Sequence, residues 1–158
     1  MVRGSDAGRY RVMLVSSSGG VLLDVLALRP WWADHEVSWA AVRAADTKAA
    51  LSGQEVTWVP EVGARQPVQV LAGLVRALRM IRRQRPDVIV SAGSGAAVPF
   101  FLAARLSRTA CVWIDTLNLV HRRGLAAGLC SRLAGGVLVQ QPSLAERYPH
   151  ALYLGELY

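Results

Sequence analysis

Lysine and cysteine are both scarce in this chain of 158 residues. Of its 18 basic residues only Lys48 is a lysine, and the net charge is +7. The two cysteines, Cys111 and Cys130, lie inside apolar runs without metal-ligand spacing, so we interpret them as small buried residues of a reducing compartment. An arginine-rich domain favours an anionic partner, because the guanidinium fork binds phosphate through two hydrogen bonds.

Long apolar runs are also missing. No stretch reaches the roughly 20 residues of a spanning helix, and residues 1–11 are polar and charged, unlike a signal peptide. We therefore expect a cytoplasmic protein that contacts a membrane only peripherally. No nucleic-acid motif and no alternation of basic and aromatic residues is present, so a phosphorylated substrate or an anionic membrane is favoured over nucleic acid.

Apolar runs alternate with helical patterns from end to end. Strands are predicted over Arg11–Val15, Glu36–Val42, Glu55–Pro60, Val88–Ser91, Ala110–Ile114, Val137–Gln140 and Ala151–Leu154. Helices are predicted over Val21–Leu28, Pro67–Gln84, Val98–Leu106, Leu125–Leu133 and Ser143–Tyr148. This order predicts a single Rossmann-like α/β domain over residues 11–158, with a parallel sheet covered by helices on both faces, after a flexible N-terminus at 1–10.

The segment Pro67–Gln84 has the clearest helical pattern. The apolar positions predicted to face the sheet are Leu71, Leu74, Val75, Leu78 and Ile81. Arg76, Arg79 and Arg83 lie on the other face, where we expect them to contact an anionic membrane or simply to face water. The pair Trp31 and Trp32 is a second candidate for membrane contact, with a place in the core as the alternative.

Two glycine-rich segments follow predicted strands. We assign to a diphosphate-binding floor the residues Ser18, Gly19, Gly20, Gly93, Ser94 and Gly95. Glycine lets the backbone approach a ligand, and a helix N-terminus offers free N–H groups to phosphate. A plain turn or close helix-on-strand packing is the alternative for each segment. The spacing is neither G-x-G-x-x-G nor that of a Walker loop, which disfavours a dinucleotide-dependent oxidoreductase.

A carboxylate directly follows the predicted strand Ala110–Ile114. Asp115 is placed to accept a hydrogen bond from a sugar hydroxyl or to act as a general base, with turn capping as the alternative. Asn118, Arg122 and Arg123 follow in the same loop, where the arginine forks could hold a diphosphate and a solvated basic loop is the alternative. No Asp-x-Asp pair is present to bind a metal, and we expect neither a metal nor a cofactor.

Several segments resemble a known family. Residues 85–93 (Arg-Pro-Asp-Val-Ile-Val-Ser-Ala-Gly) and 97–103 (Ala-Val-Pro-Phe-Phe-Leu-Ala) look like the signature of PssD/EpsE-type oligosaccharide biosynthesis subunits. Residues 138–155 resemble the closing motif of that family, and Ala45-Asp46-Thr47 resembles its short Asp-Thr segment. These proteins are bacterial relatives of the acceptor-binding subunit of the eukaryotic dolichol-linked N-acetylglucosamine transferase.

The resemblance implies a fold and a division of labour. It implies the N-terminal half of a GT-B glycosyltransferase, akin to that of MurG, with a separate subunit that binds the nucleotide sugar. This chain would hold a polyprenyl-diphosphate-linked saccharide at the cytoplasmic face of the plasma membrane. The sequence stops directly after a strand, so we expect the partner to complete the cleft. The alternative is a non-catalytic scaffold that anchors and activates the partner.

Two positions depart from the family pattern. Val21 follows Gly19-Gly20 where the family usually has histidine, and Asp115 stands where it usually has glutamate. The second change keeps the charge on a shorter side chain. We therefore expect an altered activity or a different acceptor.

Overall fold

The computed structural model describes residues 8–63, 65–116, 124–146, 148, 151–153 and 155. Within these residues seven strands form one sheet in the order β3-β2-β1-β4-β5-β6-β7, and all neighbours run parallel. The strands are β1 (Arg11–Ser16), β2 (Glu36–Val42), β3 (Val56–Val59), β4 (Val88–Ser91), β5 (Ala110–Asp115), β6 (Gly136–Val139) and β7 (Ala151–Tyr153). The predicted Rossmann-like class is confirmed.

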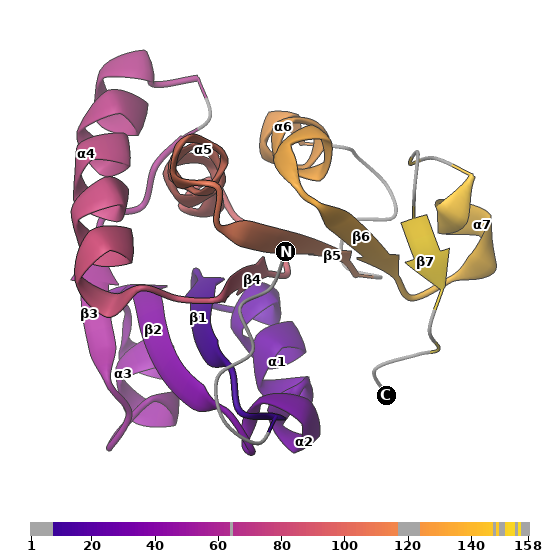
Figure 1. Cartoon of the computed structure of the whole chain (residues 1–158), viewed down its shortest axis with the longest axis horizontal. Helices are drawn as coiled ribbons and strands as arrows, with labels where there is room; N and C mark the ends of the chain where they lie inside the picture. Colours follow the sequence, from indigo (N-terminus) through magenta and orange to yellow (C-terminus); the bar gives the residue numbers. More distant parts are fainter. Residues whose placement is uncertain are drawn as a thin grey trace.

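Helices cover both faces of this sheet (Figure 1). One face carries α4 (Pro67–Gln84), α5 (Ala97–Ser107) and α6 (Leu125–Leu133). The other carries α1 (Gly20–Ala27), α2 (Arg29–Trp32) and α3 (Ala45–Ala50), while α7 (Pro142–Ala145) lies beside β7. The short helices α2 and α3 were not predicted from the sequence.

Alternate strand residues build two cores, one on each face. Met13, Ile89 and Trp113 belong to the core beneath α4, α5 and α6. Leu14 and Trp39 belong to the core on the α1 side. This arrangement explains why the strands are almost continuously apolar, since both sides of a parallel sheet are buried.

The α1 side is covered less completely over β4, β5, β6 and β7. Half-buried or exposed aliphatic side chains form an apolar strip there, made of Val88, Val112, Leu138 and Leu152. Leu152, the register partner of Leu138, is 57% exposed. A groove of about 390 Å³ runs along the strip, with Trp31 and Leu28 among its lining residues. The described residues therefore cover this part of the sheet only partly.

The long helix α4 is rotated from its predicted orientation. Leu71 and Val75, predicted to face the sheet, are 63% and 43% exposed. The buried face is instead centred on Ala77, and a Cβ on Gly73 would lie 2.8 Å from Pro99 Cγ on α5. Small residues let the two helices approach closely, and this contact rather than the number of large apolar residues sets the rotation.

The two neighbouring tryptophans have different environments. Trp32 is 6% exposed, its indole N–H donates to the Val25 carbonyl at 2.9 Å, and its ring meets Trp39 edge to face. Trp31 is 44% exposed and packs edge-on against His35. Trp32 therefore belongs to the core, and only Trp31 remains accessible for membrane contact.

Replacing Gly73 by alanine should lower the free energy of unfolding by about 1–3 kcal/mol, because the new Cβ would overlap Pro99. Gly128 in α6 is the matched control, since a Cβ there meets nothing within 4 Å. Gly128→Ala should raise the free energy of unfolding by about 0.5–1 kcal/mol through helix propensity alone. Urea unfolding measures both changes. Stabilisation by both substitutions would show that α4 and α5 do not pack tightly at Gly73.

Candidate functional site

The candidate site lies at the carboxyl edge of the sheet, where the strand order reverses. The first strand, β1, pairs with β2 on one side and with β4 on the other. The connections that leave β1 and β4 therefore run to opposite faces, and ligands of such folds bind in the crevice between them. The register sets Val15 beside Ser91 and Ser91 beside Trp113, so the ends of β1, β4 and β5 are neighbours.

The two predicted glycine loops meet at this point. A Cβ added to Gly93 would lie 2.9 Å from Cγ2 of Val21, the first-loop residue that replaces the family histidine. Gly93 has φ +149°, and Ser94 has φ +89°, which is uncommon for a residue with a side chain. The Ser91 hydroxyl donates to the Gly93 carbonyl at 2.8 Å and fixes the turn. The packing of the two loops thus depends on glycine at position 93.

The assigned floor residues differ in accessibility. Ser18, Gly19 and Gly20 are exposed, whereas Ser94 and Gly95 are half-buried. The Ser94 hydroxyl oxygen accepts the Ala96 N–H at 3.0 Å, so part of its bonding capacity serves the turn before α5. The first loop is consequently the more open part of the floor.

Buried polar side chains concentrate at the same edge. Of the eight that are buried among the described residues, seven lie at a strand end or shortly after it: Ser16, Ser17, Thr47, Ser91, Asp115, Thr116 and Gln140. The Thr116 hydroxyl is buried and makes no hydrogen bond within the described structure. Because burying polar groups costs free energy, this concentration makes the carboxyl edge the candidate site.

Asp115 ends β5 and is 4% exposed. It occupies the third of the three adjacent strand ends, beside the loop that follows β4. The structure therefore brings it to the same edge as both glycine loops. The other residues predicted for this loop, Asn118, Arg122 and Arg123, lie outside the described residues.

Some polar residues of this region were given no individual role from the sequence. Ser17, Thr116 and Gln140 are buried at strand ends. Each lies at or just after the end of an apolar run, and this position in the sequence could have predicted them. Asp24 is fully buried on α1. The hydrophobic periodicity of the helix does not predict this burial, because a charged residue is expected on the exposed face. Asp46 reaches from α3 to the first loop, where its Oδ2 accepts the Gly19 N–H at 2.8 Å.

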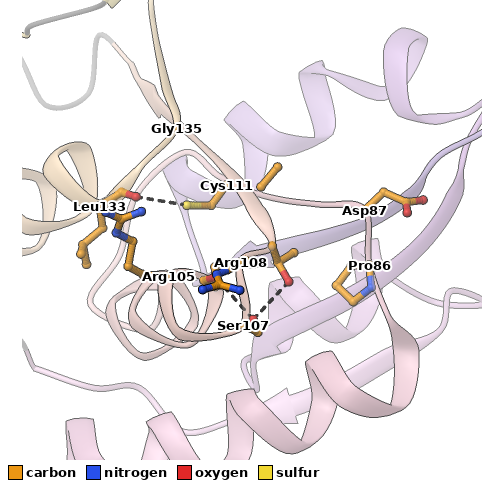
Figure 2. A pocket seen from close by; sticks show the side chains of 11 residues that line it. Pro86, Asp87, Arg105, Ser107, Arg108, Cys111, Leu133 and Gly135 are labelled. Atoms are coloured by element: carbon orange, nitrogen blue, oxygen red, sulfur yellow. Dashed lines mark hydrogen bonds between the residues drawn. The ribbon is translucent and has the colours of Figure 1, made fainter. Parts of the chain in front are cut away.

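A larger hollow of about 760 Å³ lies at the opposite, amino edge of the sheet (Figure 2). Arg105, Ser107 and Arg108 line it from the end of α5, and Cys111 lines it from β5. The Ser107 hydroxyl already donates to the Ala103 carbonyl at 2.7 Å. Arginines at a helix C-terminus favourably complement the helix dipole, which accounts for their place without a ligand.

The described residues contain neither a cluster of metal ligands nor a helix that could span a membrane. No three His, Cys, Asp or Glu side chains gather there as metal ligands would. None of the described helices combines the length and apolar character needed to cross a bilayer.

Solved structures of similar fold are GT-B glycosyltransferases and their relatives. *Acinetobacter baumannii* MurG matches with a TM-score of 0.68 and 20% identity, over 93% of this chain and 44% of the MurG chain. A complex of *S. aureus* MnaA with UDP matches with a TM-score of 0.74 and 10% identity, over 94% of this chain and 45% of that chain. The expected fold class, half of a GT-B protein, is thereby confirmed.

Residues 59–157 match the family model "Oligosaccharide biosynthesis protein Alg14 like", and the chain belongs to this family. UDP-N-acetylglucosamine transferase subunit ALG14 of *Yarrowia lipolytica* is 32% identical over 106 residues, 61% of this chain and 49% of that relative. ALG14 of *Eremothecium gossypii* is 30% identical over 92% of this chain and 79% of that relative. The match thus spans about half the length of the Yarrowia protein. The resemblance seen in the sequence is confirmed.

Gly93→Ala should lower the free energy of unfolding by about 1–3 kcal/mol, because φ is positive and the new Cβ would overlap Val21. Adding Val21→Ala removes the overlap but not the backbone strain, so the double variant should regain part of the loss. Thermal unfolding of the single and double variants measures this coupling. Strictly additive losses would argue against contact between the two loops.

Proposed function

We propose that this chain is the acceptor-binding subunit of a two-subunit glycosyltransferase. A separate partner subunit would bind the nucleotide sugar, and this chain would hold a polyprenyl-diphosphate-linked saccharide. The observation that carries the proposal is the meeting of two glycine loops and Asp115 on three adjacent strand ends. Relatives of this chain are named as subunits of a UDP-N-acetylglucosamine transferase, and this supports a second subunit.

Each part of the edge has a role in this proposal. Backbone N–H groups at the start of α1 and in the Gly93–Gly95 loop would bind the diphosphate, aided by Arg122 and Arg123. The acceptor hydroxyl attacks the anomeric carbon of the nucleotide sugar, and the bond from that carbon to the nucleotide diphosphate breaks. Asp115 accepts the hydroxyl proton as general base.

The apolar strip supports the proposal of a partner chain. A parallel sheet is normally covered on both faces, whereas Val112 and Leu138 are only half-buried and Leu152 is exposed. The described helices of this chain leave the strip open. We propose that the partner subunit packs on it.

The exposed face of α4 supports contact with a membrane. Val68, Leu71 and Val75 form an exposed apolar stripe on the first half of the helix, and they are 80%, 63% and 43% exposed. Arg76, Arg79, Arg82 and Arg83 are exposed on the second half. Apolar insertion and attraction to anionic lipid would act together on such a surface. We propose peripheral binding at the cytoplasmic face of the plasma membrane through α4.

A non-catalytic scaffold remains the second candidate function. It is favoured by Val21, which replaces the family histidine and packs its methyl group against Gly93. An apolar side chain at that place neither donates a hydrogen bond nor transfers a proton. Under this alternative the chain anchors the partner and activates it without contributing a base.

The isolated chain should not transfer sugar, whereas co-expression with a nucleotide-sugar-binding subunit should give an active heteromer. Leu152→Arg should weaken that heteromer at least tenfold, since burying a leucine is worth about 1.5–3 kcal/mol. Leu106→Arg on the opposite helix layer is the control, because Leu106 is 66% exposed. Co-purification and a transfer assay measure both effects. Turnover by the purified chain alone would refute the two-subunit proposal.

Asp115→Asn should reduce the rate of the partnered enzyme by on the order of 10²-fold, because the amide cannot take a proton from the acceptor. The control is Asp34→Asn, an exposed residue just before β2 at the other edge. Initial rates with a lipid-linked acceptor give the result. A near-normal rate would show that Asp115 is not the general base. It would favour turn capping as the role of Asp115 and the scaffold as the function of the chain.

The variant Arg76→Glu/Arg79→Glu/Arg83→Glu should lose binding to anionic phosphatidylserine vesicles, because each basic residue near the surface contributes about 1 kcal/mol. Arg105→Glu/Arg108→Glu/Arg132→Glu changes the net charge equally at the amino edge and should retain most of the binding. Vesicle sedimentation at two salt concentrations compares them. Equal loss in both triple variants would show that net charge, rather than α4, governs attachment.

A further inference from the structure

The side chain of Asp46 links the second strand to the first glycine loop. Its Oδ2 accepts the N–H of Gly19 at 2.8 Å, although the two residues are 27 positions apart in the chain. Its Oδ1 accepts the N–H of Thr47 at 2.9 Å. The segment Ala45-Asp46-Thr47 resembles a family segment, but no role of the Asp46 carboxylate was predicted from the sequence.

The backbone next to Asp46 is held in place by the hydrogen bonds of Thr47. Thr47 is fully buried, its hydroxyl donates to the Val42 carbonyl at 2.8 Å, and the same oxygen accepts the Ala44 N–H at 2.8 Å. These bonds close the turn between the end of β2 and α3. Asp46 is therefore presented from a fixed point at the carboxyl edge.

The link reaches the first loop at its most open residue. Gly19 is exposed, has φ +73°, and a Cβ there would meet nothing within 4 Å. It is also the N-cap of α1, where its carbonyl accepts the Leu23 N–H at 3.2 Å. The orientation of Gly19 therefore sets the direction of the free N–H groups that begin α1.

Electrostatics favour the link at neutral pH. The Gly19 N–H is the main cause that lowers the pKa of Asp46, outweighing the opposing effect of burial. An aspartate carboxylate is ionised at neutral pH in any case, and a hydrogen bond to an ionised acceptor is stronger than a neutral one. The same carboxylate occupies the Gly19 N–H, which leaves the N–H groups further into α1 for an anionic ligand.

We propose that Asp46 is a positioning residue that holds the first glycine loop in its acceptor-binding shape. This inference rests on the proposed function for its effect on the acceptor, but not for the bond itself. The hydrogen bond to Gly19 is the feature that acts, and the negative charge of Asp46 strengthens it. An asparagine at this position keeps an oxygen that accepts the Gly19 N–H, whereas an alanine does not.

The first experiment follows the Gly19 amide in the whole chain by hydrogen exchange and NMR. Asp46→Ala should speed exchange at Gly19 by about tenfold or more, the loss expected for one hydrogen bond to a charged group. Asp46→Asn, whose neutral oxygen still accepts the Gly19 N–H, should speed exchange less than Asp46→Ala does. Asp34→Ala, which removes an exposed carboxylate at the opposite edge, should change nothing at Gly19. Unchanged exchange in Asp46→Ala would overturn the proposal.

The second experiment measures KM and kcat of the partnered enzyme with a polyprenyl-diphosphate-linked acceptor. Asp46→Ala should raise the acceptor KM about tenfold with little change in kcat. Asp46→Asn should give a KM between those of the wild type and the alanine variant. Equal KM values for the alanine and asparagine variants would overturn the positioning role. If the wild-type pair transfers no sugar, the proposed function is refuted, and so is the effect of Asp46 on the acceptor. The exchange experiment still decides whether Asp46 holds the first loop.

Discussion

The pairing of β1 with β4 is the contact on which the candidate site depends. It places the end of the first strand beside Ser91. Because β1 also pairs with β2 on its other side, the strand order reverses at β1. Crossovers in parallel sheets are right-handed, so the chain leaves β1 toward one face and β4 toward the other. The crevice, the meeting of Val21 with Gly93 and the neighbouring position of Asp115 all follow from that pairing.

In the described part of the chain the two faces of the sheet are unequally covered. The face under α4, α5 and α6 is closed, with Ile89 and Trp113 fully buried. The opposite face is closed by α1 and α2 over β1 and β2 but remains half-open along the apolar strip. Exposed apolar surface on a parallel sheet is costly in water, which is consistent with a surface that another chain covers.

Much of the fold was predictable because the strands are short, apolar and bounded by turn residues. Val88–Ser91 has the same bounds in the sequence prediction and in the structure, and so does Pro67–Gln84, which proline begins and proline follows. The glycine loops and Asp115 were located for the same reason, since each directly follows an apolar run. The short α3 escaped prediction because its stability comes from bonds of Thr47 to Val42 and Ala44, not from periodicity.

By itself the sequence determined the order of elements, the class of the sheet and the residues at each strand end, because these depend on local hydrophobic pattern and turn chemistry. Only the tertiary structure decided which strands are neighbours and which faces are covered. It turned Leu71 outward because Gly73 lets α4 approach Pro99 closely. It also brought Asp46 to Gly19, because a hydrogen bond between distant residues exists only after the strands that carry them have paired.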